Sequence, residues 1–172
     1  SLVPGQSVIF DSGSTVMEAA KAVVAKSIRI LAITNDLQIA QILGSSPAVH
    51  VHVFGGQLRP GSNTLVGEEV LCAARSIRAD VLFFGAHAVT EGIVSETSPE
   101  VAAVKRVLMQ SASSRRLLVD SSKFRPRVFM SVCKVSDLEE VITDDGAPVE
   151  ELERIRGAGV KLTLSGRGAR GE

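Results

Sequence analysis

The sequence predicts an α/β fold with a mainly parallel, Rossmann-like sheet that carries helices on both of its faces. Short apolar runs alternate with helical patterns along nearly the whole chain, which is the order of elements that builds a parallel sheet. The chain is 45% hydrophobic but only 3% aromatic, so its core must be aliphatic, as is typical of a sheet covered on both faces. A length of 172 residues suits one well-buried domain.

Each element is predicted from the spacing of its apolar residues and from the capping residues and prolines at its ends. Apolar runs predict strands at 7–11, 29–34, 49–54, 81–85, 116–120 and 161–164, and more weakly at 130–134 and 140–143. Helical spacing predicts helices at 15–26, 36–43, 65–77, 99–113, 135–138 and 148–158. Asp36 is a suitable N-cap, and Pro99 after Ser98 suits a first helical turn. We therefore expect one domain over 1–165 and a flexible Gly-rich tail over 166–172.

The charge balance and the cysteines argue against several classes of function. The 19 basic and 19 acidic residues cancel, so there is no general basic field for DNA or for a membrane surface. Cys72 and Cys133 match no metal or redox spacing, and we expect them to be buried, reduced thiols of a cytoplasmic protein. We expect no signal peptide, and the sequence contains no apolar run of transmembrane length. We expect no membrane partner, no metal and no cofactor.

The turn from Asp11 to Thr15 connects the first predicted strand to the first predicted helix. Gly13 permits a tight turn, and Ser12, Ser14 and Thr15 offer hydroxyl groups beside helix amides that have no partner within the helix. With the positive end of the helix dipole, these groups suit one phosphate-sized anion. The alternative is that Ser12 or Ser14 merely caps the helix, as such residues commonly do.

Polar residues also follow four other predicted strands. Ligands bind beyond the carboxyl ends of parallel strands, where the strand order reverses, so all of these residues are expected at one crevice. They are Thr34-Asn35, Gly55-Gly56, Gly85-Ala86-His87 and Asp120-Ser121-Ser122-Lys123. Lys123 would add the positive charge that hydroxyl donors lack, and Lys105 on the helix at 99–113 would border the crevice. For both lysines the alternative is a solvated surface position.

Two common nucleotide-binding motifs are missing from the predicted strand-to-helix turns of the chain. No Gly-x-x-x-x-Gly-Lys-Ser/Thr loop occurs, and no Gly-x-Gly-x-x-Gly opens a helix. A small phosphate monoester therefore fits the short turn after the first strand better than ATP or NAD does.

These residues, in this order, resemble the C-terminal sensor domain of the DeoR (deoxyribose-operon-repressor) family over about residues 4–165. The matching stretches are Phe10-Asp11-Ser12-Gly13-Ser14-Thr15, Thr34-Asn35, Phe54-Gly55-Gly56, Leu65-Val66-Gly67, Ala79-Asp80-Val81-Leu82-Phe83-Phe84-Gly85, Glu91-Gly92-Ile93, Ala103-Val104-Lys105-Arg106 and Val119-Asp120-Ser121-Ser122-Lys123-Phe124. Each stretch is weak alone, but the ordered set is specific, above all the closing Asp-Ser-Ser-Lys-Phe.

The resemblance implies a fold shared with ribose-phosphate isomerase, glucosamine-phosphate deaminase and coenzyme A transferases. It also implies a regulator, usually a repressor of sugar catabolism, in which a phosphorylated sugar bound to this domain alters DNA affinity. DNA would be contacted only by an N-terminal winged helix-turn-helix, which we expect outside this chain because the chain begins with Ser1 rather than Met. A homo-oligomer is expected, since operators are commonly read by symmetric dimers.

The resemblance, together with the charge of Lys123 and the position of His87 on the loop after a central strand, assigns the site residues. Ser12, Gly13, Ser14, Thr15 and Lys123 would hold the phosphate of the effector. The sugar would be lined by Asp11, Asn35, Gly56, His87, Lys105 and Asp120.

The competing interpretation is a sugar-phosphate isomerase or deaminase of the same superfamily. Such an enzyme needs a carboxylate in the crevice to move protons. Ribose-phosphate isomerases typically show Gly-Ala-Asp-Glu after the central strand, whereas this chain reads Gly85-Ala86-His87-Ala88, so both acids are missing. His87 or the nearby Glu91 remains a conceivable base, so catalysis is disfavoured rather than excluded. No catalytic Glu of a coenzyme A transferase can be assigned. We therefore expect a sensor without catalytic residues.

Overall fold

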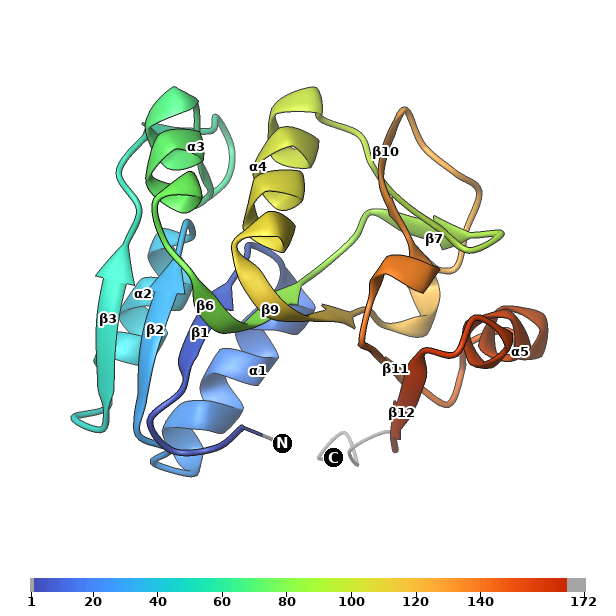
Figure 1. The fold of residues 1–172 in the computed structure, drawn as a ribbon, viewed down its shortest axis with the longest axis horizontal. Helices are drawn as coiled ribbons and strands as arrows, with labels where there is room; N and C mark the ends of the chain where they lie inside the picture. Colours follow the sequence, from blue (N-terminus) through green and yellow to red (C-terminus); the bar gives the residue numbers. More distant parts are fainter. Residues whose placement is uncertain (1, 167–172) are drawn as a thin grey trace.

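A seven-stranded parallel sheet forms the centre of the molecule (Figure 1). The computed structural model describes residues 2–166. In spatial order the strands are β12 (Lys161–Ser165), β11 (Glu140–Asp144), β9 (Ala112–Leu118), β6 (Ala79–Phe84), β1 (Ser7–Phe10), β2 (Ile30–Thr34) and β3 (Val49–Val53). Every neighbouring pair in this sheet is parallel, which confirms the predicted fold class.

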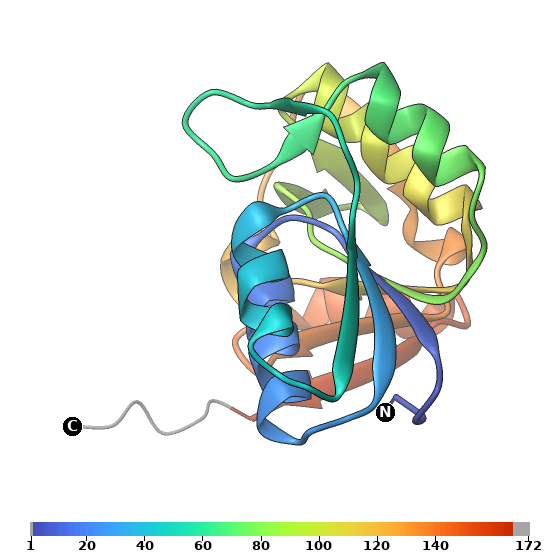
Figure 2. The ribbon, with the colours of Figure 1, turned by 90° about the vertical axis from the view of Figure 1, so that its left-hand side faces the viewer.

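Helices cover both faces of the sheet, as predicted. α1 (Ser14–Ala25) and α2 (Leu37–Gly44) pack on one face, and α3 (Glu68–Arg75), α4 (Pro99–Gln110) and α5 (Val149–Gly157) pack on the other. Figure 2 shows the first pair in blue and cyan, opposite α3 and α4 in green and yellow. Central strand β1 serves both cores, because Val8 and Phe10 join one apolar cluster and Ile9 joins the other. The two-residue period of a strand therefore explains why Val8, Ile9 and Phe10 of β1 are all apolar.

Two small antiparallel sheets lie outside the main sheet. β4 (Gln57–Leu58) and β5 (Leu65–Val66) form a hairpin, and β7 (Ala88–Thr90), β8 (Ile93–Glu96) and β10 (Met130–Lys134) form a three-stranded sheet. Of these strands the sequence predicted only β10. Segments of two to four residues are too short to display an alternating pattern, which is why the others were missed.

Three predicted helices differ from the observed elements. The helix predicted at 65–77 starts only at Glu68, because the preceding residues belong to β5. The helix predicted at 99–113 ends at Gln110, and β9 starts at Ala112. The first half of β9 is polar and partly exposed, so no apolar run marks it in the sequence. The helix predicted at 135–138 is a single 3-10 turn, η2 (Val135–Asp137).

The prediction of two buried cysteines is wrong for Cys72. α3 buries Val70 and Ala74, and Cys72 lies two residues from each of them, which turns its side chain to the solvent side of the helix. Cys133 on β10 is partly buried, and burial raises the pKa of its thiol to about 12.

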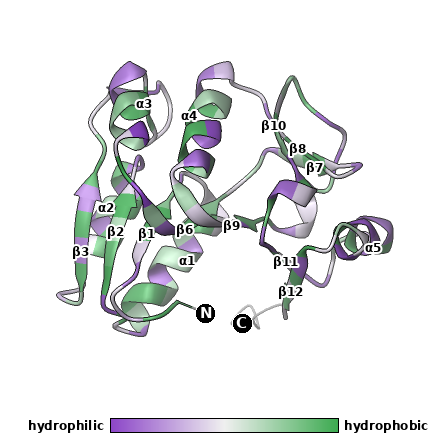
Figure 3. Ribbon diagram, in the orientation of Figure 1, coloured by the Kyte–Doolittle hydropathy of each residue, from purple (hydrophilic) through white to green (hydrophobic). Residues whose placement is uncertain are grey.

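The outer surface is polar where helices face solvent, as the hydrophilic turns of α5 illustrate (Figure 3). No helix within residues 2–166 is both long enough and apolar enough to cross a bilayer. The predicted tail at 166–172 lies outside the described residues, apart from Gly166.

Candidate functional site

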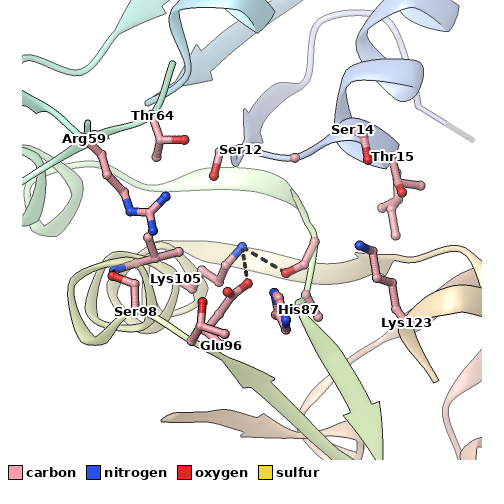
Figure 4. Close-up of a pocket in the computed structure, with 16 residues that line it drawn as sticks. Ser12, Ser14, Thr15, Arg59, Thr64, His87, Glu96, Ser98, Lys105 and Lys123 are labelled. Atoms are coloured by element: carbon pink, nitrogen blue, oxygen red, sulfur yellow. Dashed lines mark hydrogen bonds and ion pairs between the residues drawn. The ribbon is translucent and has the colours of Figure 1, made fainter. Parts of the chain in front are cut away.

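A cavity of about 220 Å³ lies beyond the carboxyl ends of β1 and β6. The strand order reverses between these two strands, because the chain runs outward from β1 through β2 and β3 and then continues on the other side through β6. Figure 4 shows the side chains that line the cavity. They come from Ser12, Gly13, Ser14, Thr15, Arg59, Thr64, Gly85, Ala86, His87, Glu96, Thr97, Ser98, Val101, Lys105, Leu118 and Lys123.

The N-terminal end of α1 presents unpaired backbone amides to this cavity. Its N-cap is Gly13, at φ 130° and ψ 152°, and no side chain accepts a hydrogen bond at this cap. Neither Ser12 nor Ser14 therefore caps the helix, and both hydroxyls line the cavity instead. The first turn of α1 contains no acidic residue, so nothing on the helix itself compensates the positive end of its dipole.

Lys123 faces the same cavity from the 3-10 turn η1 (Ser121–Lys123) (Figure 4). Asp120 is the N-cap of this turn, and its carboxylate accepts hydrogen bonds from the backbone N–H of Ser122 at 2.9 Å and from the Ser122 hydroxyl. The Asp144 carboxylate accepts a further bond from the N–H of Ser121 at 2.7 Å. Asp120 is thus absent from the lining of the cavity but fixes the turn that presents Lys123.

Lys105 is buried in α4, with only 2% of its side chain exposed, so it is not a solvated surface lysine. Its Nζ forms an ion pair with Asp11, lies 3.4 Å from the Glu96 carboxylate and donates a hydrogen bond to the Gly85 carbonyl oxygen at 3.0 Å. Burial by itself lowers the pKa of the ammonium group, but the two carboxylates outweigh burial and raise the pKa above its ordinary value. Lys105 therefore stays charged and ties α4 to the ends of β1 and β6.

The two carboxylates around Lys105 occupy different positions. Asp11 is 1% exposed and lies behind the cavity lining, and its Oδ1 has no hydrogen-bond partner among the described residues. Glu96 lines the cavity and was missed by sequence reasoning, because it ends β8, which was itself not predicted. Its position two residues before the Ser98-Pro99 helix start was the one available signal.

Asn35 and Gly56 do not line the cavity, but both position the β4–β5 hairpin beside it. The side-chain amide of buried Asn35 donates to the Leu65 carbonyl oxygen at 3.1 Å, while its backbone carbonyl accepts from the Leu65 N–H at 2.7 Å. A Cβ atom on Gly56 would lie 2.6 Å from the Val70 side chain and 2.8 Å from the Val66 carbonyl oxygen. Only glycine therefore fits where the hairpin meets α3.

This hairpin brings Arg59 and Thr64 to the cavity wall, and sequence reasoning missed both residues. The two residues close the hairpin loop, since the N–H of Arg59 donates to the Thr64 carbonyl oxygen at 2.9 Å. The signal in the sequence was the glycine pair at 55–56 followed by a turn, but which side of the turn meets the cavity depends on the fold.

His87 lines the cavity on a loop that is fixed by its backbone. Its N–H donates to the Ser95 carbonyl oxygen at 3.1 Å, and its carbonyl oxygen accepts from Arg125 Nε at 2.9 Å. Glu91 is not among the lining residues and lies in the turn between β7 and β8, where its N–H donates to the Glu151 carboxylate. No group of three or more potential metal ligands occurs within residues 2–166.

The N-terminal end of α4 also reaches the cavity, but its own residues leave fewer free donors there than remain at α1. The Ser98 hydroxyl accepts a hydrogen bond from the N–H of Val101, at 3.4 Å. Pro99 lacks an N–H group, and Glu100 adds an acid in the first turn. The helix start predicted at Pro99 is confirmed.

Comparison with known proteins agrees with the observed fold. Residues 1–145 match the family model of the DeoR C-terminal sensor domain. The chain is 32% identical over 163 residues to the HTH-type transcriptional regulator GlpR of Haloferax volcanii, covering 94% of this chain and 63% of that protein. It is 29% identical over 153 residues to the lactose phosphotransferase system repressor of Staphylococcus epidermidis, covering 88% of this chain and 60% of that protein.

The chain thus spans about three fifths of the length of these relatives. Among solved structures, a D-ribose-5-phosphate isomerase in complex with phospho-erythronic acid superimposes with a TM-score of 0.51 at 14% identity, over 72% of this chain and 48% of the other. At that identity the likeness concerns the fold alone, and it confirms the fold shared with sugar-phosphate isomerases.

Proposed function

The chain belongs to the family of DeoR C-terminal sensor domains, and on that premise we propose that it binds a phosphorylated sugar as the effector of a transcriptional regulator. The relatives described above are named as transcriptional regulators or repressors, not as enzymes. The proposed site is the cavity beyond β1 and β6, with the phosphate at the α1 end and the sugar toward α4.

One observation carries the proposal: the uncapped N-terminal end of α1 and Lys123 face the same cavity. Ser12, Gly13, Ser14 and Thr15 offer amide and hydroxyl donors, and Lys123 adds a full positive charge. Lys123 takes part in none of the ion pairs among residues 2–166. Donors and a cation without an anion partner are the combination that a phosphate group satisfies.

The proposed sugar contacts divide into direct and indirect ones. His87 and Lys105 line the cavity and would contact the sugar, and Glu96 would accept hydrogen bonds from its hydroxyl groups. Asp11 acts through Lys105, Asn35 and Gly56 act through the hairpin, and Asp120 acts through the turn that carries Lys123. These indirect residues are positioning residues in our proposal.

In the full-length protein, ligand binding here would change the affinity of a helix-turn-helix segment for DNA. The name of the Haloferax relative includes such a segment, and a neutral domain is suited to sensing rather than to contacting DNA. We propose a symmetric homo-oligomer as the form that couples the two events, and a role as a repressor of sugar catabolism. Mobility-shift titration of full-length protein, with and without the sugar phosphate that binds best, measures this coupling.

Calorimetric and thermal-shift titrations test the proposed ligand class. We expect phosphorylated hexoses or pentoses to bind and to raise the melting temperature, and the matching free sugars to do neither, because the phosphate provides the anchoring charge. Inorganic phosphate serves as the control for an anion without a sugar. If no phosphorylated sugar binds, or if free sugars bind equally well, the proposal fails.

A sugar-phosphate isomerase or deaminase remains the second candidate, and the Glu96–Lys105 pair is the observation that favours it. A carboxylate and an ammonium group on one cavity wall are the groups that move a proton and stabilise an enediolate. Glu96, however, is held by Lys105, and the loop after β6 supplies His87 in place of an acid. Turnover of an aldose phosphate that is abolished by Glu96→Gln would establish the enzyme and overturn the sensor without catalysis.

A further inference from the structure

Three cationic side chains, those of Arg59, Lys105 and Lys123, line the cavity, and their charges are balanced very differently. Lys105 is paired with the carboxylates of Asp11 and Glu96. Arg59 and Lys123 take part in none of the ion pairs among residues 2–166. The cavity therefore holds two cations that lack an anionic partner, and the phosphate in the proposed function satisfies only Lys123.

The two unpaired cations lie at opposite ends of the cavity. Figure 4 shows Arg59 beside Ser98 on one side of the view and Lys123 beside Thr15 on the other. The buried Lys105 and its partner Glu96 lie between them (Figure 4). The cavity is thus positive at both ends, while its middle offers a carboxylate that accepts hydrogen bonds from hydroxyl groups.

Arg59 is held at its end of the cavity by the base of the hairpin. Its N–H donates to the Thr64 carbonyl oxygen, and Thr64 is only 7% exposed and forms an antiparallel β-bridge with Asp36, the N-cap residue of α2. Buried Asn35 holds Leu65 through two hydrogen bonds. A fixed backbone reduces the freedom that the arginine side chain must lose on binding an anion.

The α4 end of the cavity offers an anion weaker contacts than Arg59 does, because its lining residues Thr64, Thr97 and Ser98 are neutral. Ser98 already caps the helix, Pro99 offers no N–H group, and Glu100 repels negative charge. The planar guanidinium of Arg59, by contrast, matches the two oxygens of a phosphate or a carboxylate.

We propose that the effector carries two anionic groups at opposite ends of a hydroxylated chain, the second of them bound by Arg59. The ligand class is a sugar bisphosphate or a phosphorylated sugar acid. This inference rests on the proposed function, because it takes the first phosphate at the α1 end as given. Phosphate and carboxylate share the chemistry that Arg59 recognises, so the experiment has one arm for each.

The experiment compares single-anion and double-anion sugars by isothermal titration calorimetry. One arm sets fructose 1,6-bisphosphate against fructose 6-phosphate and fructose 1-phosphate, and the other sets 6-phosphogluconate against glucose 6-phosphate. We expect the double-anion member of at least one arm to bind roughly ten- to hundredfold more tightly, as one charged hydrogen-bonded contact predicts. The arm that shows the gain identifies the second group.

Variants assign the gain to Arg59. Arg59→Gln is expected to abolish the advantage of the double-anion ligand and to leave the affinity for the single-anion ligand within about twofold, whereas Arg59→Lys retains part of it. Arg156→Gln, on the exposed side of α5, makes the same charge change outside the cavity and should retain the full advantage. The melting temperature without ligand shows that each variant is folded.

The outcomes separate this inference from the proposed function. Equal affinity for both ligand types, or an advantage that survives Arg59→Gln, overturns the second-anion assignment while single-anion binding continues to support the proposed function. If no sugar phosphate of either type binds, both proposals are overturned.

Discussion

Helices α1 and α4 point their N-terminal ends at one cavity, yet the two ends differ in every feature that matters to an anion. α1 starts after Gly13 without a side-chain cap and has no acid in its first turn. α4 is capped by Ser98, starts with Pro99 and has Glu100 in its first turn. Both helices have the same positive dipole at the N-terminal end, so the local residues decide which end keeps free amides for a ligand.

A helix end attracts an anion only where the chain has left its amides unsatisfied. A serine beside a helix start has opposite effects at the two ends. The Ser98 hydroxyl accepts a hydrogen bond from an N–H group of α4, whereas the Ser14 hydroxyl adds a free donor beside α1. Variants at the two helix ends, and at the lysine that joins them, test this difference.

Replacement of Lys105 by Met is expected to have the largest effect. Lys105 joins α4 to Asp11, which directly precedes the α1 turn, and its loss would leave two buried carboxylates without a counter-ion. Breaking a buried pair in this way costs about 3–5 kcal/mol of unfolding free energy. Urea denaturation measures the loss.

Lys21→Met is the matched control, because Lys21 pairs with Glu18 on the exposed side of α1, where a pair contributes about 0–1 kcal/mol. A loss at Lys105 no larger than the loss at Lys21 would contradict the role that we assign to the buried pair. The raised pKa of Lys105 means that its contribution is complete at pH values below the ordinary pKa of 10.5 and is lost only as the pH rises through the raised value.

Reversing the charge at the α1 end is expected to abolish phosphate recognition without unfolding the domain. Ser14→Glu and Lys123→Glu each place a negative charge where the phosphate is proposed to bind, and a loss of affinity of roughly a hundredfold or more is expected. Calorimetry with a phosphorylated sugar measures the effect. Lys26→Glu, an exposed residue beyond the other end of α1, makes the same change as Lys123→Glu and should leave the affinity unchanged. Unchanged affinity in both site variants would put the ligand elsewhere.

Gly13→Ala tests whether the open cap depends on glycine. At φ 130° and ψ 152° an L residue is strained by about 1–3 kcal/mol, and a Cβ atom there would touch nothing within 4 Å, so the cost is one of backbone conformation. Thermal or urea unfolding measures it. Gly44→Ala in the last turn of α2 also meets open space but has no positive φ, so it should be neutral or stabilising by up to about 1 kcal/mol. Equal effects at the two glycines would refute the strain argument.

The smallest expected effects form a crossed pair of serine variants. Ser98→Ala removes the cap of α4 and should cost about 1 kcal/mol of stability while leaving the affinity for a single-anion sugar phosphate unchanged. Ser14→Ala removes no cap, so stability should hold while the affinity falls. Chemical denaturation measures the stability of both variants, and calorimetry measures their affinity for the sugar phosphate. If Ser14→Ala lowered stability as Ser98→Ala does, the distinction between the two helix ends would be lost.

Much of the fold could be predicted because it is encoded locally. The period of the apolar residues indicated the main strands and helices, and the caps at Asp36 and Ser98 lie where the sequence placed the starts of α2 and α4. The strands of the two small sheets, other than β10, were not predictable, because they are short and their partners lie elsewhere in the chain. The polar first half of β9 was not predicted for a related reason. Its position in the sheet is set by its neighbouring strands rather than by its own sequence pattern.

The candidate site likewise combines features encoded by neighbouring residues with features made by residues far apart in the chain. The turn from Ser12 to Thr15, the position of Lys123 and the α/β order that directs strand ends toward one crevice could be predicted, because they depend on residues adjacent in the chain. The burial of Lys105 against Asp11, 94 positions away, and the entry of Arg59 and Glu96 into the cavity became visible only in the folded chain. Ion pairs and cavity walls join segments that the sheet order brings together, and no local pattern of side chains encodes that order. That the α1 end has no side-chain cap was likewise visible only in the structure, since an uncapped amide is defined by the hydrogen bonds that surround it.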